Sequence, residues 1–426
     1  MERNDPRYQA YVEILKEELI PAMGCTEPIA LAYAAAKARE VLGVLPDSVQ
    51  LQVSGSIIKN VKSVIVPNTG HLKGMETAVA ARIIAGSAEK ELEVISEVSE
   101  EKKSAIRDYL QTVPITIEHT EQGHVFDIVV TERCGQDYAR VRIADYHTNI
   151  CCIEKNGTVL YEVPLLDETV QEDARADRSL LNMQDIWDFA ETADLRDVAD
   201  LLERQIRYNN AIAEEGLLGD YGANIGRVLL TTYGNDVSNR AKAKAAAGSD
   251  ARMNGCELPV IINSGSGNQG ITCSVPLIEY AKELHSGKEK LYRALIISNL
   301  VAIHEKTGIG TLSAYCGAVS AGAGAGAGIV YLCGDGYQAA IHTVVNALAI
   351  VSGIVCDGAK ASCAAKIASS VDAALLGYNM YKCNQEFKGG DGIVMKDIET
   401  TIKGIGRLGK DGMRQTNEEI IRLMMS

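Results

Sequence analysis

The stretch that decides the fold is 308-GIGTLSAYCGAVSAGAGAGAGIVYLCG-334, which an apolar run and then 354-IVCDGAKASCAAK-366 follow. No charged residue lies between Thr311 and Gly334, and glycine and alanine dominate the segment. So little side-chain bulk lets backbones approach each other closely. The stretch therefore predicts a buried helix that packs tightly against its neighbours.

The cysteines of this stretch have three possible roles. They can be inert, because free cysteine is often fully buried. Alternatively, the whole segment can be a transmembrane helix, although it is poor in leucine and lacks a basic flank. The third role is a cluster or metal site. On one helix Cys356 and Cys363 would lie about 10 Å apart, but Asp357-Gly358 favours a turn. Cys356 can then fold back toward Cys363 in the first turn of the next helix, where thiolate is favoured.

The composition limits the possible partners. The chain has 426 residues, a formal net charge of −14 and 11 cysteines. The negative charge argues against nucleic acid and anionic membranes as partners. The first residues are charged and resemble no secretory signal, so the cysteines point to a reducing compartment. We expect a cytoplasmic protein whose thiols are free or metal-bound.

Hydrophobic periodicity predicts an α+β fold, with a large, mostly α-helical C-terminal domain and a smaller α+β domain inserted after N-terminal helices. The expected units are N-terminal helices in residues 1–45 that pack on the C-terminal domain, an α+β domain over 46–165 with strands in 47–67, a linker over 166–182, and the helical domain over 183–426.

Two further segments are candidates for binding. Cys25 precedes a helix that begins near Pro28, and the helix dipole lowers the pKa of a thiol there. The loop Ser264–Gly270 precedes another helix, and its successive amides can bind an anion. No Gly-Lys-Ser/Thr follows, so a small carboxylate fits better than a nucleotide. The predicted substrate-binding residues are Ser264, Ser266, Gly267, Asn268 and Gln269.

The proton-transfer residue is harder to locate from sequence. His71 lies in a loop between Gly70 and Gly74, which favours exposure to a cleft, and it is our first candidate for a catalytic base. Lys360 is the other predicted catalytic residue. His304 and Lys306 are further candidates, but a solvated helix end is the simpler interpretation of both.

Three motifs together resemble a known family. These are 21-PAMGCTEPIALAYA-34, 264-SGSGNQG-270 and 355-VCDGAKASCAAKI-367. They are similar to the L-cysteine desulfidases, which are related to the alpha part of the iron–sulfur-dependent bacterial L-serine dehydratases. The resemblance covers essentially the whole chain.

The resemblance implies a 4Fe–4S lyase that converts L-cysteine to pyruvate, ammonia and sulfide. In such enzymes three cysteines hold the cluster and one iron stays open for substrate. The matching positions are Cys25, Cys316 and Cys356. The serine dehydratases match Cys316, Cys356 and, with a longer spacing, Cys363. Their serine–histidine–threonine loop is echoed around His71, where the serine and threonine are missing.

Several alternatives stay open at this point. The same cluster could serve L-serine dehydration, the same cysteines could bind zinc, or the protein could be a non-catalytic amino-acid-binding protein. We expect a small amino acid as substrate, a homodimer as the assembly, and neither nucleic acid nor membrane as a partner.

Overall fold

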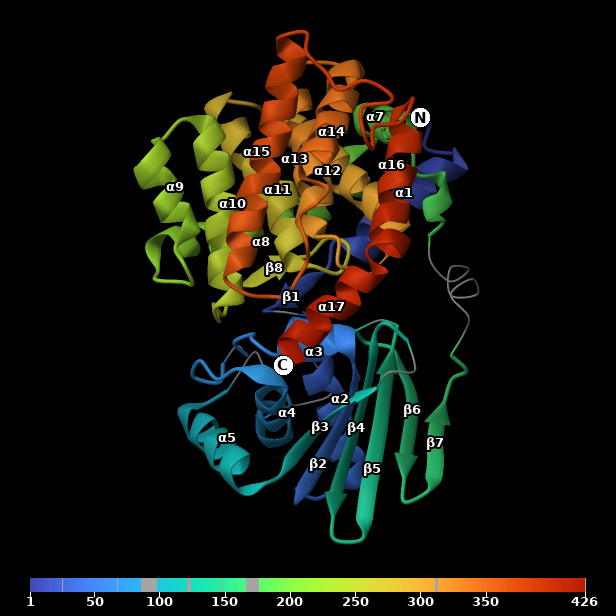
Figure 1. Cartoon of the computed structure of the whole chain (residues 1–426), viewed down its shortest axis with the longest axis vertical. Helices are drawn as coiled ribbons and strands as arrows, with labels where there is room; N and C mark the ends of the chain where they lie inside the picture. The colour runs from blue at the N-terminus through green and yellow to red at the C-terminus, as the bar shows by residue number, and fades with distance from the viewer. Residues whose placement is uncertain are drawn as a thin grey trace.

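The computed structural model describes residues 1–24, 26–66, 68–85, 98–120, 124–145, 147–165, 176–310 and 313–425. Figure 1 shows two parts, a large helical part and a smaller part built on a sheet, which meet at a narrow waist. The predicted α+β class, with a large helical part, is confirmed.

The helical part contains most of the chain after the sheet. Its helices are α1 (Pro6–Glu18), α7 (Met183–Thr192), α8 (Ala199–Leu218), α9 (Ile225–Tyr233), α10 (Val237–Met253), α11 (Gly267–Glu283), α12 (Lys288–Ile309), α13 (Gly317–Cys333), α14 (Tyr337–Val351), α15 (Ser362–Lys382), α16 (Ile398–Arg407) and α17 (Arg414–Met425).

The glycine-rich helix α13 is the centre of this part, because it packs against α11, α12, α14 and α15. A Cβ added to Gly324 would lie 2.4 Å from the carbonyl oxygen of Ser298 on α12. A Cβ added to Gly322 would lie 2.8 Å from the backbone of Ser370 on α15. The small residues are therefore the reason that the helices can approach so closely. Among the described residues, no helix combines the length and the apolar character that crossing a bilayer requires.

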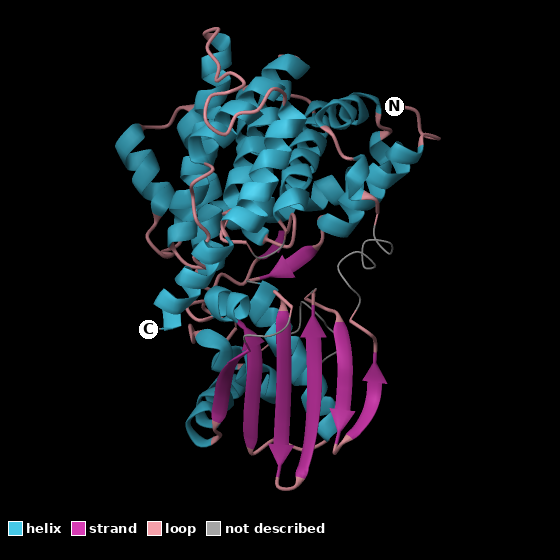
Figure 2. Cartoon of the chain, turned by 45° about the vertical axis from the view of Figure 1, so that its right-hand side comes forward, coloured by secondary structure: helices cyan, strands magenta, loops and turns pink. Residues whose placement is uncertain are grey.

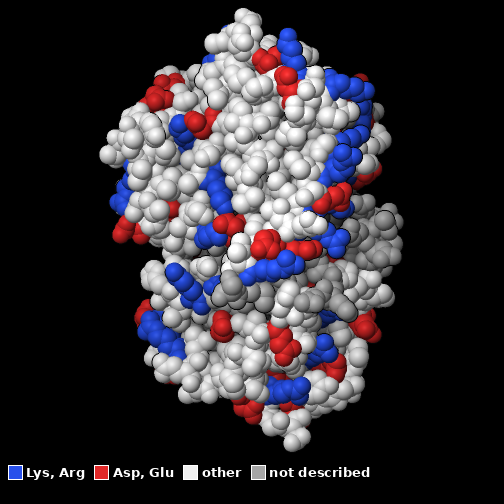
Figure 3. All heavy atoms as spheres, viewed as in Figure 1, with Lys and Arg blue, Asp and Glu red and all other residues white. Residues whose placement is uncertain are grey.

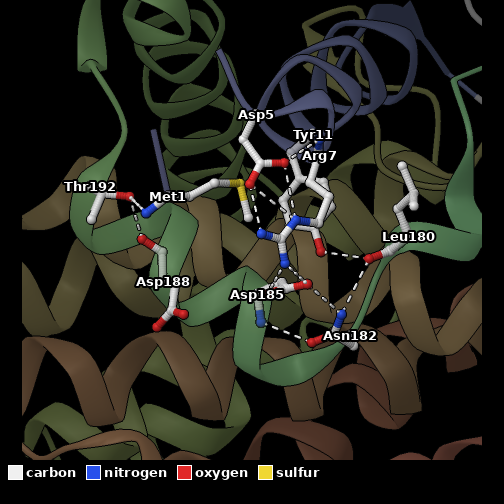
Figure 4. A network of polar contacts seen from close by, with 9 residues as sticks. All are labelled: Met1, Asp5, Arg7, Tyr11, Leu180, Asn182, Asp185, Asp188 and Thr192. Atoms are coloured by element: carbon white, nitrogen blue, oxygen red, sulfur yellow. Dashed lines mark hydrogen bonds and ion pairs between the residues drawn. The ribbon is translucent and has the colours of Figure 1, made fainter. Parts of the chain in front are cut away.

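Helix α1 is attached to the helical part by polar contacts as well as by apolar packing. Figure 4 shows Arg7 between the carboxylates of its own segment and Asp185 at the start of α7. Arg7 Nη1 lies 2.9 Å from both carboxylate oxygens of Asp185. Tyr11 Oη donates to the carbonyl of Leu180 at 2.8 Å. The N-terminal helix is thereby joined to a segment about 170 residues away in sequence.

The smaller part is a six-stranded mixed sheet with strand order β3-β2-β4-β5-β6-β7. Strands β2 and β3 are parallel and the other neighbours are antiparallel. Figure 2, which looks onto the sheet, shows the helices of this part behind it. The elements are β2 (Ser48–Ser54), β3 (Ile115–Thr120), β4 (Asp127–Cys134), β5 (Asp137–Ala144), β6 (Ile150–Lys155), β7 (Thr158–Glu162), α2 (Thr26–Leu42), α3 (Gly55–Val61), α4 (Gly74–Ala85) and α5 (Glu100–Thr112).

Two local predictions differ from the structure. The helices of residues 1–45 were expected to pack together on the C-terminal domain, but only α1 does, and α2 buries its alanine-rich face against β4 and β5. Strands were expected throughout 47–67, but α3 follows β2 directly. Its β-branched residues Ile57, Ile58 and Val61 favour a strand in isolation, and their burial in the core of the smaller part overrides that preference.

Two of the segments that cross the waist lie among the described residues. Strand β1 (Pro21–Met23) pairs antiparallel with β8 (Pro259–Ile261), which leads into the Ser264–Gly270 loop. At the other end of the chain, α17 descends from the helical part and packs against α3 (Figure 1). On the face seen in Figure 3, charged side chains of both signs gather along this junction.

Candidate active site

The waist brings the first two sequence motifs together. Because β1 pairs with β8, the residues that follow each strand emerge side by side. Thr26, at the start of α2, donates from its Oγ1 to the carbonyl of Gly265 at 3.2 Å and to Glu27 Oε2 at 3.1 Å. Ser264 and Gly265 both have positive φ, 48° and 74°, which makes the tight turn into α11.

The third motif reaches the same loop through Gln269. Its side chain lies against Gly317, where an added Cβ would be 2.6 Å from Gln269 Cδ. Gly317 is the first residue of α13, and Cys316 is its N-cap. The loop that was predicted to bind substrate is therefore next to the first of the C-terminal cysteines.

Cys316 and Cys356 lie on neighbouring backbone segments. Tyr315 and Val355 form an antiparallel bridge. The amide of Cys316 donates to the carbonyl of Ile354 at 3.1 Å, and the amide of Cys356 donates to the carbonyl of Ala314 at 2.6 Å. This pairing holds the two cysteines together although 40 positions separate them in sequence.

The segment after Cys356 is a non-helical loop, as the Asp357-Gly358 pair predicts, and it rests on α3. Gly358 has φ +96°, and a Cβ there would lie 2.1 Å from the carbonyl oxygen of Lys59. Cys363 follows in the first turn of α15 and packs with Val64 and Met253. The turn thus brings a segment of the smaller part against the cysteine segment.

Burial dominates the thiol chemistry. It raises the pKa of the Cys316 thiol to about 12, and the nearby Cys356 adds to the shift. Burial also raises the pKa of Cys363, although that residue lies in the first turn of α15. The helix N-terminus, from which we expected a thiolate, is therefore the weaker effect at Cys363.

Two buried lysines face the cysteines. Lys59 on α3 is 2% exposed, and its Nζ donates to Asn417 Oδ1 on α17 at 2.6 Å. Burial lowers its pKa, while Cys356 and Glu27 oppose that shift. Lys306 is also buried, and burial lowers its pKa to about 8. The expectation that Lys306 lies at a solvated helix end was wrong, because Lys306 is only 7% exposed.

Four buried polar atoms at the waist have no hydrogen-bond partner among the described residues. They belong to side chains around the loop and the start of α2, and they are Asn60 Oδ1, His147 Nε2, Arg252 Nε and Gln269 Oε1. Buried polar atoms are nearly always paired in folded proteins. Their clustering marks this part of the waist as a place for a polar ligand.

His147 comes from the loop between β5 and β6 and was not predicted. Its Cε1 would lie 3.7 Å from a Cβ on Gly265, and its ring packs edge-on against Phe126. Burial lowers its pKa, with Glu27 opposing the shift and Arg252 adding to it. His147 is therefore a neutral imidazole near pH 7 with a free ring nitrogen beside the loop.

Sequence comparisons place this site in a family. The profile of the serine dehydratase alpha chain matches residues 89–422. The chain belongs to the serine dehydratase alpha chain family. It is similar over its whole length to a UPF0597 protein of Desulfitobacterium hafniense strain Y51, with 61% identity covering 100% of this chain and 99% of the relative. UPF0597 proteins of Lachnoclostridium phytofermentans (52% identity, 98% and 100% coverage) and Treponema denticola (46%, 100% and 100%) are also similar.

The predicted catalytic residues of this dehydratase-related chain lie at the edge of the site. His71 is exposed and in a left-handed conformation with φ 66°, and its Nδ1 would lie 3.8 Å from a Cβ on Gly255. Lys360 donates to the carbonyl of Asp357 at 2.6 Å and pairs with its carboxylate at 2.8 Å. His304 pairs with Glu399 at 2.8 Å. None of these contacts reaches the Ser264–Gly270 loop.

The cysteines suit a thiolate-bound iron–sulfur cluster, which carries negative charge and prefers sulfur ligands. Cys316 and Cys356 offer two thiols on neighbouring backbone segments, and Lys59 and Lys306 provide buried positive charge close to them. Among the residues that the structure describes, no three His, Cys, Asp or Glu side chains form a metal-binding group. Cys25, the third predicted ligand, lies outside those residues.

Proposed function

We propose that this chain is an iron–sulfur-dependent lyase that acts on L-cysteine, with Cys25, Cys316 and Cys356 as cluster ligands and Cys363 close by. The observation that carries the proposal is the convergence of three distant motifs. Thr26 contacts Gly265, and Gln269 of the same loop contacts the first residue after Cys316. Membership of the serine dehydratase alpha chain family supports the same class of reaction.

The reaction is a β-elimination followed by hydrolysis. A base removes the α-proton of L-cysteine, the Cβ–S bond breaks, sulfide leaves with the electron pair, and a carbon–carbon double bond forms. The resulting enamine becomes an imine, and water converts it to pyruvate and ammonia. A bound cluster would supply an open iron that acts as a Lewis acid toward the leaving group.

The described residues have defined tasks in this scheme. The Ser264–Gly270 loop holds the substrate carboxylate at the N-terminus of α11, where backbone amides are free and the helix dipole is positive. Ser266 is the N-cap and makes no side-chain hydrogen bond to those amides, so they stay open to a ligand. Lys59 and Lys306 stabilise negative charge at the cysteine segment.

For the base, His147 joins the two residues proposed from sequence, His71 and Lys360. We favour His147 because it is buried beside Gly265 and its Nε2 has no partner among the described residues. His71 is exposed, and Lys360 is held by Asp357. A neutral imidazole with a free nitrogen is ready to accept a proton.

L-Serine is the second candidate substrate, because the matching family is the serine dehydratase alpha chain. Both substrates need the same carboxylate site and the same base, and they differ only in whether sulfide or water leaves. The cysteine-specific proposal rests on Cys25 in the 21-PAMGCTEPIALAYA-34 motif, as opposed to the longer C-terminal spacing of the dehydratases.

The test is anaerobic reconstitution with iron and sulfide, followed by measurement of sulfide and pyruvate from L-cysteine and of pyruvate from L-serine. Cys25→Ala, Cys316→Ala and Cys356→Ala should each lose bound iron and the broad visible absorbance of the cluster. Cys333→Ala is the matched control, because Cys333 ends the same helix, α13, and is exposed. It should keep both iron and activity.

Three results would contradict the proposal in different ways. Iron binding that survives Cys316→Ala and Cys356→Ala would remove the ligand assignment. Zinc in place of iron would favour a zinc site. Amino-acid binding without product release from the reconstituted protein would favour a non-catalytic binding protein.

A further inference from the structure

Arg252, in the last turn of α10, is a buried cation without a counter-ion among the described residues. Arg252 is only 4% exposed. Its Nη1 donates to Asn268 Oδ1 at 3.2 Å, its Nε has no acceptor, and none of the ion pairs among the described residues includes it. A buried charge is costly unless an opposite charge or hydrogen bonds compensate it. The position therefore calls for an anion.

The guanidinium lies at the start of α11. A Cβ on Gly267 would lie 2.3 Å from Arg252 Nε and 2.7 Å from Cζ, so glycine is needed at this position for the arginine to fit. Gly267 is the first residue of α11, and the helix has no side-chain cap. An anion here meets a guanidinium, the first amides of a 17-residue helix and the positive end of its dipole.

The neighbouring unpaired atoms are of the opposite kind. Asn60 donates its amide to Glu27 Oε1 at 2.9 Å, which orients the group and leaves Oδ1 as an unpaired acceptor. Gln269 Oε1 is a second buried acceptor without a described partner. Glu27 and Arg252 both shift the pKa of His147, so His147 lies close to each of these two charged residues. Unpaired donors, which are Arg252 Nε and the first amides of α11, and unpaired acceptors in the same region complement a ligand with a carboxylate and an ammonium group.

We propose that Arg252 is the carboxylate anchor of the active site and determines its specificity for carboxylate-bearing ligands. The assignment rests on the proposed function insofar as the ligand is the amino-acid substrate of the same site. Asn268 holds the guanidinium in place, and the first amides of α11 share the carboxylate with it. Charge-assisted, bidentate contact of this kind is the strong form of carboxylate recognition.

The test is isothermal titration calorimetry of the cluster-free, full-length protein with three ligands. Each ligand carries a hydroxyl group in place of the thiol of L-cysteine, so that it cannot undergo thiol exchange with the cysteines of the protein. L-Serine carries both charged groups, 3-hydroxypropionate lacks the ammonium group, and ethanolamine lacks the carboxylate. Hydrogen bonds to charged groups contribute about 1.5–3 kcal/mol, so Arg252→Gln should weaken binding of L-serine and 3-hydroxypropionate by about 10- to 100-fold. Binding of ethanolamine should not change.

The pattern across ligands separates recognition from folding. Arg252→Lys keeps the charge but not the fork of donors and should recover part of the affinity for L-serine. Arg240→Gln, on the same helix, should leave all three affinities unchanged, because Arg240 is paired with Glu283 away from the loop.

Equal weakening of all three ligands by Arg252→Gln, or no weakening of L-serine, would overturn the assignment, as would failure of the wild-type protein to bind L-serine. Arg252-dependent binding in a protein that releases no sulfide or pyruvate after reconstitution would leave the anchor standing and refute the proposed reaction. The two hypotheses can therefore fail separately.

Discussion

Around α13, glycines and alanines let four helices pack so closely that a single added Cβ at Gly324 would lie 2.4 Å from a carbonyl oxygen. At the waist the buried residues are long and polar, and atoms of Asn60 and Arg252 have no partner among the described residues. The core also buries a carboxyl group, Glu305, and burial raises its pKa well above the usual range. At the waist, the buried ionisable side chains include the cations Lys59 and Arg252.

This difference between the core around α13 and the waist indicates that the core mainly provides stability and the waist mainly provides function. Close packing without voids is how a protein interior gains stability. A buried polar atom left unpaired costs about 1–3 kcal/mol, so the waist gives up stability that a bound ligand can restore. Substitutions in the core should therefore act on unfolding, and substitutions at the waist should act on activity.

The largest expected effect is at the waist. His147→Gln removes the proposed base and should lower kcat for L-cysteine by about 10²- to 10⁴-fold, as is usual for general bases. His71→Gln is the matched control and should keep kcat near wild type. Since burial lowers the pKa of His147, the base stays neutral at a lower pH than an ordinary histidine, and the acid limb of kcat/KM should fall below the usual histidine range.

Both histidine variants should unfold at the wild-type temperature, measured by circular dichroism. A large loss of kcat in His71→Gln with none in His147→Gln would restore the sequence-based choice of base. A loss in neither would make Lys360 the next candidate.

The second effect belongs to the core. Gly324→Ala adds a Cβ where Ser298 and Ala302 leave no room, and overpacking of this kind costs about 1–3 kcal/mol. The urea midpoint should fall accordingly, while kcat of the folded fraction stays unchanged. Gly353→Ala is the matched control, because nothing lies within 4 Å of the added atom. Equal stability of the two variants would contradict the view that close helix approach requires these glycines.

The close packing of the core could be predicted from sequence, because the residues that allow it are neighbours along the chain. The glycine and alanine repeat of residues 317–328 limits side-chain volume whatever surrounds it, and the Asp357-Gly358 pair signals a turn by its own chemistry. The cysteine and loop motifs were likewise found as continuous stretches. Their convergence could be inferred only through the family resemblance.

The missed residues have no comparable local signal. Lys59 and Asn60 lie in a segment whose pattern favours a strand, and Arg252 is one of several charges in an alanine-rich helix. Each is buried only because the two parts of the molecule meet over it. Arg252 follows Asp250 and Ala251 in a helix that also carries Arg240, Lys242 and Lys244, so its sequence context does not set it apart from the other charged residues of α10.

The smallest expected effect tests whether the end of the chain belongs to the site. Asn417 on α17 accepts a hydrogen bond from Lys59, 358 positions earlier, and so joins the last helix to the cation beside Cys356. Asn417→Ala removes the acceptor and leaves the ammonium group to reorient. We expect a loss of stability of about 1 kcal/mol and a fall in kcat/KM of about tenfold, because one charge-assisted hydrogen bond is lost.

Gln415→Ala, on the same helix and exposed, is the control. If both variants keep full activity on L-cysteine, α17 only covers α3 and Lys59 does not depend on it. If Asn417→Ala alone loses activity, with no more than this small loss of stability, the C-terminal helix positions a residue of the site, and the waist rather than either part alone is the functional unit.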